Sequence, residues 1–336
     1  MRLYRKIFFP FVPVYYSVTC LRNKLYDLNV KSSVSYDFPV ICVGNLSVGG
    51  TGKTPMIEYL IRFLKDEYSV ATLSRGYKRK TKGFQLADMN ASAATLGDEP
   101  FQFYNKFKDT IKVAVDEKRV NGIKQLRALA NPPEIILLDD AFQHRKVRAG
   151  FNILLTTFSE LFTKDFVLPA GNLREPRKGA RRADVIVVTK CPENITDTVK
   201  RNILEEIKPG AHQTVFFSTI QYAGKVESEK ESLSVESLPA FTLVTGIAKP
   251  KPLVQYLKDK GLKFDHLNFK DHHAFSEQDV EDFANRDLII TTEKDYMRLK
   301  QYAVLKNKLF YLPIHATIDN ASNFNQLIKN FVGQKN

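Results

Sequence analysis

A glycine-rich loop follows the first strongly apolar segment of the chain. Its residues, Ser47-Val-Gly-Gly-Thr-Gly-Lys-Thr54, match the phosphate-binding pattern G-x-x-x-x-G-K-[ST], except that Ser47 replaces the first glycine. The glycines leave the backbone free to turn N–H groups toward phosphate oxygens. Lys53 would lie along the β- and γ-phosphates, and Thr54 would offer its hydroxyl to Mg²⁺. We therefore predict a nucleoside triphosphate site formed by Ser47, Val48, Gly49, Gly50, Thr51, Gly52, Lys53 and Thr54.

The second half of such a site is an acidic residue that follows an apolar strand. The segment Ile135-Ile-Leu-Leu-Asp139-Asp140 supplies two candidates, Asp139 and Asp140, for holding the metal or its waters. Two aspartates after a strand are more often the start of a loop than a metal site. The glycine loop upstream reverses that preference, and the pattern leaves open which aspartate binds Mg²⁺.

These residues need a scaffold of buried strands and helices. Short apolar segments rich in β-branched residues recur along the first two thirds of the chain, and a helical pattern covers residues 54–67. The segments are residues 38–43, 68–73, 112–115, 134–138, 152–155 and 184–188. Apolar strands that alternate with helices predict an α/β fold with a mainly parallel sheet covered on both faces.

The pattern changes after residue 212. Between residues 213 and 238 polar and aromatic residues alternate around Gly224 and a charged turn, which indicates a hairpin-like linker. Apolar segments at 241–245, 288–291 and 308–311 then predict a second, smaller α/β unit. The expected division is an N-terminal segment (1–30), a nucleotide-binding unit (31–212), a linker (213–240) and a C-terminal unit (241–336).

The composition is that of a folded protein with an anionic partner. The 336 residues include 50 Lys and Arg against 37 Asp and Glu, a net charge of +13. Such an excess suits nucleic acid, a phosphorylated small molecule or an acidic membrane face. Three cysteines without metal-like spacing argue against a zinc site or a disulfide framework and favour a reducing compartment. No nucleic-acid recognition module is visible, so we expect no nucleic-acid partner.

The first thirty residues combine aromatic and basic side chains. Their longest uncharged run, residues 7–21, contains Pro10 and Pro13 and is shorter than the roughly 20 residues of a membrane-spanning helix. Five basic residues and one acid accompany the aromatic side chains. This mixture suits a segment that lies in the lipid headgroup region, and a helix packed on its own domain is the alternative.

Seven further fragments complete an ordered series. They are Ser74-Arg-Gly-Tyr-Lys-Arg79, Leu96-Gly-Asp-Glu-Pro100, Asp139-Asp-Ala-Phe-Gln-His144, Pro169-Ala-Gly-Asn-Leu-Arg-Glu-Pro176, Val244-Thr-Gly-Ile-Ala248, Asp271-His-His273 and Thr292-Glu-Lys-Asp295. Together with the glycine loop, this series closely resembles the tetraacyldisaccharide 4′-kinase family of lipid A biosynthesis. Two positions depart from the family pattern: Ala141 stands where glycine is expected, and Lys249 replaces a more usual asparagine.

The resemblance implies an activity and a fold. The expected reaction transfers the γ-phosphate of ATP, with Mg²⁺, to the 4′-hydroxyl of a tetraacylated disaccharide 1-phosphate, giving lipid IVA. It would take place at the cytoplasmic face of the bacterial inner membrane, on a peripheral or monotopic enzyme that we expect to be a monomer. The implied fold is a P-loop NTPase-like α/β/α unit and a smaller α/β/α unit, joined by a two-stranded linker with the active site in the cleft.

The resemblance also implies roles for individual residues. Asp98 matches the proposed general base, which takes the proton of the acceptor hydroxyl. His272 from the second unit would pair with it, and its neighbour His273 is the alternative. Arginines counter phosphate charge through bidentate contacts. The residues implied to bind substrate are Arg75, Glu99, Arg119, Asn172 and Arg174, and Arg174 and Lys53 would also act in catalysis.

Two other enzyme or regulatory classes share the glycine loop. A P-loop kinase for a soluble metabolite would need no aromatic, basic N-terminal segment. A GTPase or a metal-delivery chaperone that reads guanine typically carries Asn-Lys-x-Asp after an apolar strand. Here Val188-Thr-Lys-Cys191 lacks both the asparagine and the aspartate, which disfavours guanine recognition.

Overall fold

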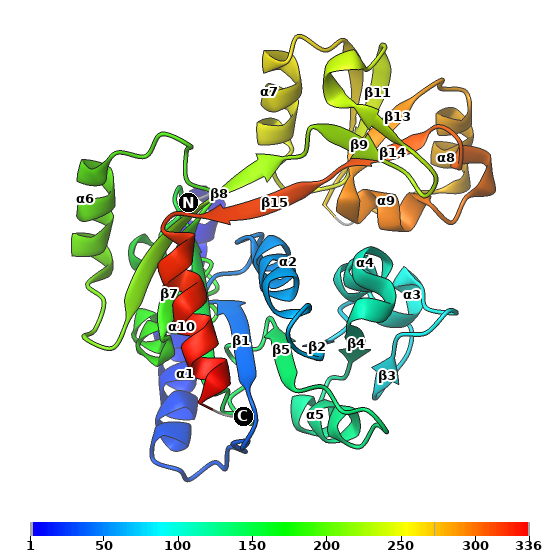
Figure 1. Cartoon of the computed structure of the whole chain (residues 1–336). Helices are drawn as coiled ribbons and strands as arrows, with labels where there is room; N and C mark the ends of the chain where they lie inside the picture. Colours follow the sequence, from blue (N-terminus) through cyan, green and yellow to red (C-terminus); the bar gives the residue numbers. More distant parts are fainter. Residues whose placement is uncertain (1–2, 272, 335–336) are drawn as a thin grey trace.

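The computed structural model describes residues 3–271 and 273–334, which form two α/β units (Figure 1). The larger unit is built on a nine-stranded sheet of order β15-β8-β7-β6-β1-β5-β2-β4-β3. The strands from β8 to β4 run parallel, and antiparallel β15 and β3 form the edges. The bounds are β1 (Val40–Asn45), β2 (Val70–Ser74), β3 (Gln85–Leu86), β4 (Lys112–Val115), β5 (Ile135–Asp139), β6 (Phe151–Thr157), β7 (Val185–Thr189), β8 (Thr214–Tyr222) and β15 (Ile314–Ile318).

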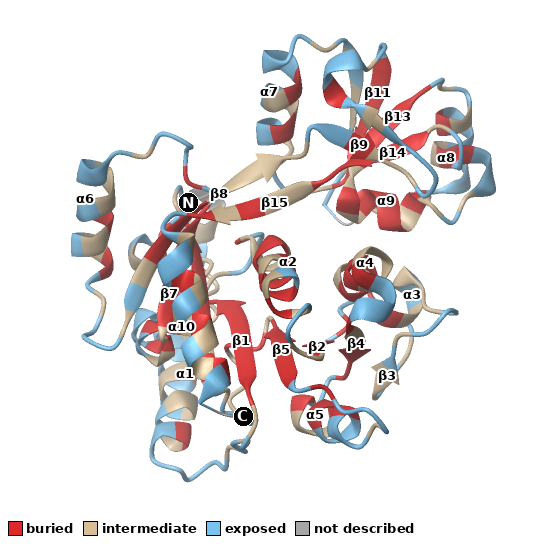
Figure 2. Ribbon diagram, viewed as in Figure 1, coloured by how far each residue is buried: buried red, intermediate tan, exposed pale blue. Residues whose placement is uncertain are grey.

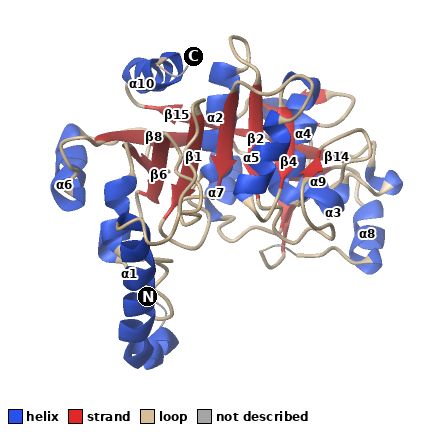
Figure 3. Cartoon of the chain, turned by 90° about the horizontal axis from the view of Figure 1, so that it is seen from below, coloured by secondary structure: helices blue, strands red, loops and turns tan. Residues whose placement is uncertain are grey.

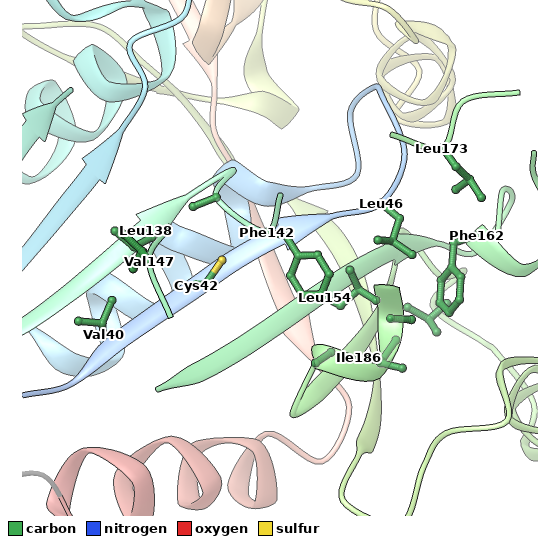
Figure 4. Packing of buried hydrophobic residues seen from close by; sticks show 14 of the residues in the cluster. Val40, Cys42, Leu46, Leu138, Phe142, Val147, Leu154, Phe162, Leu173 and Ile186 are labelled. Atoms are coloured by element: carbon green, nitrogen blue, oxygen red, sulfur yellow. The ribbon is translucent and has the colours of Figure 1, made fainter. Parts of the chain in front are cut away.

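Helices cover both faces of this sheet, which is why β1, β5 and β7 are buried at every residue. One face packs against α2 (Lys53–Leu64), α4 (Asp98–Phe107) and α10 (Ala321–Gly333), with short α3 (Ala93–Leu96) preceding α4. The other face packs against α5 (Arg119–Arg127) and α6 (Asp197–Ile207). On that face Leu46, Leu173 and Phe162 gather near the glycine loop, while Val40, Cys42 and Leu138 lie further along the sheet (Figure 4). The predicted α/β fold is confirmed.

The smaller unit has a six-stranded sheet of order β10-β9-β14-β13-β11-β12. Strands β12, β11, β13 and β14 are parallel, and antiparallel β9 and β10 complete one edge. Helix α7 packs on one face, and α8 and α9 pack on the other. The bounds are β9 (Lys225–Glu227), β10 (Ser232–Ser234), β11 (Phe241–Thr245), β12 (Phe264–Asn268), β13 (Ile289–Thr292), β14 (Leu309–Leu312), α7 (Lys251–Asp259), α8 (Glu277–Ala284) and α9 (Glu293–Leu299).

The connection between the units differs from the predicted division. Strands β8 and β15 pair antiparallel and run side by side between the units (Figure 1), so the second strand of the linker comes from residues 314–318, not from 213–240. The β9–β10 hairpin belongs to the smaller sheet. After β15 the chain returns to the larger unit, where α10 buries Phe324, Ile328 and Val332 against α2 and the sheet. Residues 314–333 therefore belong with the larger unit.

An apolar cluster joins the units where α4 faces α9. It combines Leu96 and Phe101 from the larger unit with Tyr296, Met297 and Leu299 from α9. Figure 2 shows buried positions on both helices along this boundary. The second unit therefore packs directly on the helix that begins at Asp98.

The N-terminal segment consists of a 3-10 helix, Leu3–Phe11, followed by α1 (Val12–Asp27). Helix α1 lies at one side of the larger unit and extends beyond its strands (Figure 3). Within the described residues, no helix has the length and apolar character needed to cross a membrane.

Candidate active site

The glycine loop connects the end of β1 to the start of α2. Gly49 and Gly52 have φ angles of 113° and 88°, in the left-handed region that favours glycine. Gly52 directly precedes Lys53, the first residue of α2. The loop therefore ends at a helix N-terminus, where the backbone N–H groups and the helix dipole both favour a bound anion.

Side chains at the carboxyl ends of β1 and β7 brace this loop. Asn45 Nδ2 donates to Thr51 Oγ1 at 2.8 Å, and Thr189 Oγ1 donates to the Thr51 carbonyl at 2.7 Å. Lys190 Nζ donates to the Gly50 carbonyl at 2.6 Å. These three bonds tie Gly50 and Thr51 of the loop to groups at the ends of β1 and β7.

The predicted substrate residue Asn172 lies on a second loop that runs beside the first. Ser47 forms an isolated β-bridge with Leu173, and the Val48 N–H donates to the Asn172 carbonyl at 2.8 Å. The Asn172 side-chain oxygen accepts a bond from Arg5 Nη1 at 2.5 Å. Asn172 therefore connects the glycine loop to the N-terminal segment.

Asp140 joins two of the predicted cations. Lys53 Nζ lies 3.6 Å from Asp140 Oδ1, and Arg174 Nη1 lies 2.9 Å from both carboxylate oxygens. Burial raises the pKa of Asp140, but the charges of Lys53 and Arg174 more than offset it, so the pKa falls below its usual value. Asp140 stays ionised and holds the loop lysine next to Arg174.

Asp139 is more deeply buried, with only 3% of its surface exposed. Its Oδ2 accepts a bond from Ser74 Oγ at 3.1 Å, whereas its Oδ1 has no hydrogen-bond partner among the described residues. Burial, together with the nearby charge of Glu99, raises the pKa of Asp139 to about 7, although Lys53 opposes the rise. A buried carboxylate oxygen without a partner fits a metal ion or a metal-bound water.

Across the described residues, no group of three His, Cys, Asp or Glu side chains could hold a metal ion. A Mg²⁺ site of the nucleotide type needs fewer protein ligands, because one or two protein oxygens and the phosphates share the ion. Thr54, at the first turn of α2, and Asp139 are the residues that fit it.

The two other predicted arginines lie in different environments. Arg119 is buried, and burial lowers its pKa. Its Nη1 donates to the Asp116 carbonyl at 3.0 Å and its Nη2 to the Asp139 carbonyl at 3.2 Å, so it braces the end of β5. Arg75 directly follows β2 and is exposed. Of the two, Arg75 has the more accessible guanidinium.

Asp98 and Glu99 form the first turn of α4. Glu99 is near enough to Asp139 for its charge to raise the pKa of that carboxyl, so both lie at the same edge of the sheet. Asp98 Oδ2 accepts a bond from Arg298 Nε at 3.0 Å and another from Arg298 Nη2. Arg298 belongs to α9, so a residue of the second unit reaches the predicted base.

The two histidine candidates differ in what can be said of them. His272, predicted to pair with Asp98, lies outside the described residues. His273 Nε2 lies 3.0 Å from Asp279 Oδ2, and its ring stacks on Phe269 with centroids 4.6 Å apart. His273 is therefore engaged within the second unit.

Comparison with known proteins agrees with this geometry. A family model described as Tetraacyldisaccharide-1-P 4′-kinase matches residues 4–333. The chain belongs to the tetraacyldisaccharide 4′-kinase family. The resemblance noted from the sequence fragments is thereby confirmed.

Individual relatives of this kinase-family chain match it over nearly its whole length. A tetraacyldisaccharide 4′-kinase of Flavobacterium johnsoniae is 52% identical, covering 99% of this chain and 98% of the relative. One of Bacteroides fragilis is 43% identical, covering 97% and 93%. A crystal structure of the "apo" form of LpxK from Aquifex aeolicus in complex with ATP has 31% identity and a TM-score of 0.79, covering 98% of this chain and all of that one.

Three residues at the site of this 4′-kinase family member were missed from the sequence. Lys190 directly follows an apolar strand, a position that could have been noticed. Arg298 stands three residues after the Thr292–Asp295 fragment, but nothing local indicates its contact with Asp98. Glu175 is buried and accepts bonds from Asn23, Gln143 and Arg182, a convergence that only the fold reveals.

Proposed function

We propose that this chain is the ATP-dependent kinase that phosphorylates the 4′-hydroxyl of tetraacyldisaccharide 1-phosphate, giving lipid IVA. The observation that carries the proposal is the gathering of one set of groups at the carboxyl edge of the larger sheet. A braced glycine loop and the Lys53–Asp140–Arg174 cluster lie together there, and Gly97, the neighbour of Asp98, packs against Gly76 and Tyr77 in the loop that follows β2 at the same edge. Family membership over residues 4–333 supports the substrate class.

ATP would be held by the loop from Ser47 to Thr54. When bound, Mg²⁺ neutralises charge on the β- and γ-phosphate oxygens. We assign Asp139 and Thr54 to the metal or its waters, because Asp140 is already engaged by Lys53 and Arg174.

The acceptor needs a base, since an alcohol is a poor nucleophile. Asp98 would take the proton of the 4′-hydroxyl as its oxygen bonds to the γ-phosphorus and the bond from that phosphorus to ADP breaks. Lys53 and Arg174 counter the charge on the transferring group. We assign Arg75, Glu99 and Asn172 to substrate contacts and Arg119 to support of Asp139, while His272 pairing with Asp98 stays a prediction from the family pattern.

A substrate with four acyl chains resides in a membrane, and the N-terminal segment is suited to contact the membrane surface. Among the described side chains of its 3-10 helix and α1, five apolar ones are 60 to 75% exposed: Ile7, Phe11, Val14, Val18 and Leu21. They recur at intervals of three and four residues, so those within α1 share one helix face. We propose that this face rests on the cytoplasmic side of the inner membrane with the enzyme as a monomer.

Contacts between the N-terminal segment and the site support the same arrangement. Tyr15 Oη donates to the Arg174 carbonyl at 2.9 Å, and Arg5 bonds to Asn172. The proposed membrane-facing segment therefore bonds directly to the loop that carries Asn172 and Arg174. Such coupling would present the sugar to Lys53 and Asp98 while the acyl chains stay in the lipid.

The decisive experiment is transfer of labelled γ-phosphate from ATP to the disaccharide 1-phosphate, with the new phosphate located by NMR. We expect a single new phosphate at the 4′ position and no transfer to the deacylated sugar. Excess GTP should not suppress the reaction. Phosphate at another position, an equal rate on an unacylated acceptor, or dominance of GTP over ATP would each contradict the proposal.

Membrane contact is tested separately by co-sedimentation with vesicles of phosphatidylethanolamine and phosphatidylglycerol. The double variant Val14→Asp, Val18→Asp should lose most of the binding, because its charges would enter the lipid face of α1. Met89→Asp is the matched control, since Met89 is 96% exposed but lies outside the N-terminal segment. Equal binding by the double variant and the control would contradict the assignment.

A further inference from the structure

Helix α9 of the second unit contributes a guanidinium to the predicted base. Arg298 Nε donates to Asp98 Oδ2 at 3.0 Å, and its Nη2 donates to the same oxygen. Both side chains are largely buried, with 12% of Arg298 and 21% of Asp98 exposed. A charge-assisted contact from two nitrogens of one planar group fixes direction as well as charge.

Arg298 is itself held in place by a buried carboxylate. Its Nη1 lies 3.2 Å from Asp295 Oδ1. Asp295 has no exposed surface, and its Oδ2 accepts bonds from the Gly246 N–H at 2.8 Å and from Thr292 Oγ1 at 2.7 Å. Because Gly246 directly follows β11 and Thr292 ends β13, the guanidinium is anchored to the sheet of the second unit.

The two units do not need this pair merely to stay together. Leu96 and Phe101 already pack against apolar residues of α9. A second ion pair, between Lys106 Nζ of α4 and Glu293 Oε1 of α9, spans the same boundary at 2.5 Å. Arg298 bonds to Asp98, the carboxylate proposed to take the proton of the acceptor hydroxyl. This contact points to a role beyond holding the two units together.

We propose that Arg298 is a positioning residue for Asp98 and that Asp295 orients Arg298. This inference rests on the proposed function of Asp98 as the base. The guanidinium favours the ionised carboxylate, which is the form that can accept a proton. By holding Oδ2, it also fixes the direction in which Oδ1 points. Asp98 is then correctly oriented only when the second unit is packed on α4.

The test compares Arg298→Ala with the matched control Lys106→Ala, since both remove a cation from the α4–α9 boundary. Arg298→Ala should lower kcat about 10- to 100-fold, part of what a general base contributes, while KM for ATP and lipid changes less than about twofold. Lys106→Ala should leave kcat within about threefold. Arg298→Lys, which keeps the charge but not the fork, should recover part of the loss.

Two further measurements separate positioning from folding. Free guanidinium at millimolar concentration should partly restore kcat of Arg298→Ala and leave Lys106→Ala unchanged. The double variant Asp98→Ala, Arg298→Ala should be no slower than Asp98→Ala alone, because the arginine acts through that carboxylate. Asp295→Asn should reproduce a milder form of the Arg298→Ala loss.

The outcomes distinguish this inference from the proposed function. A wild-type kcat for Asp98→Ala would remove Asp98 as base, and the inference with it. A large loss for Asp98→Ala with none for Arg298→Ala would overturn the inference alone. Equal losses for Arg298→Ala and Lys106→Ala without rescue by guanidinium would also overturn it, in favour of simple docking.

Discussion

Glutamine in place of Glu293 should stabilise the protein at pH 8 and change its stability little at pH 5. Lys106 Nζ lies 2.7 Å from Glu58 Oε2 and 2.5 Å from Glu293 Oε1, so two buried carboxylates share this ammonium. Glu293 is 5% exposed, and its Oε2 has no hydrogen-bond partner among the described residues. The negative charge of an ionised Glu293 is therefore only partly neutralised at the boundary between the units.

The size of the effect comes from the pKa of Glu293. Burial, with the charge of Glu58 added, raises this pKa from 4.5 to about 7, although Lys106 opposes the rise. At about 1.4 kcal/mol for each tenfold change in proton affinity, keeping Glu293 ionised in the folded protein costs on the order of 3 kcal/mol.

The sign follows from proton binding. The folded protein binds this proton more tightly than the unfolded chain, so the contribution of Glu293 is most favourable below about pH 4.5. It declines as the pH rises to about 7 and is constant above. A glutamine resembles the protonated form at every pH, so the variant should gain about 1 to 3 kcal/mol at pH 8 and little at pH 5.

Urea denaturation at the two pH values measures this difference. Glu229→Gln is the control, because Glu229 pairs with Lys300 on the surface, and that partner, with others, lowers its pKa. The control should show no gain at pH 8. Stabilisation of Glu293→Gln by the same amount at both pH values, or a loss at pH 8, would refute the argument.

Three further substitutions test the site and the core. Lys53→Met should lower kcat for phosphate transfer at least about 100-fold with unchanged circular dichroism, since it removes a cation aimed at the phosphates; retained turnover would contradict its role. Arg174→Met removes two charge-assisted bonds to Asp140, so kcat/KM should fall about 10- to 100-fold, whereas exposed Arg177→Met should change it little; equal effects would count against the pair. Phe103→Ala deletes a fully buried ring and should lower the free energy of unfolding by about 3 to 5 kcal/mol in urea titrations; a change below about 1 kcal/mol would mean that the core collapses to fill the space.

Most of the fold was predictable because buried parallel strands leave a strong local signal. Strands β4 and β11 begin and end at the predicted residues, and the other predicted strands are displaced by at most a few. Strand β12 was missed because Phe264–Asn268 is an edge strand with no fully buried residue, so it carries polar side chains. The return of α10 to the larger unit was missed because a helical pattern does not specify which sheet its apolar face covers.

The site was predictable only where its residues are contiguous. The glycine loop and the paired aspartates each lie within one short segment. Lys190 and Arg298 reach the site through strand order and docking of the units, which no local pattern encodes. The family resemblance implied that Arg119 binds substrate, but its donors face the carbonyls of Asp116 and Asp139, because side-chain direction is fixed only by the fold.

One face of α4 meets the second unit along its whole length. Asp98 in its first turn bonds to Arg298, Phe101 in the middle lies under the Lys300 ammonium at 5.4 Å, and Lys106 near its end pairs with Glu293. Asp98, the proposed base, and Glu293, the buried carboxylate, lie at opposite ends of this contact. Stability and catalysis should therefore respond to different substitutions. Relief of charge at Glu293 should strengthen packing without changing the direction of Asp98. Loss of Arg298 should change the direction of Asp98 and leave the packing largely intact, since the apolar centre and the Lys106 pair would still hold the units together.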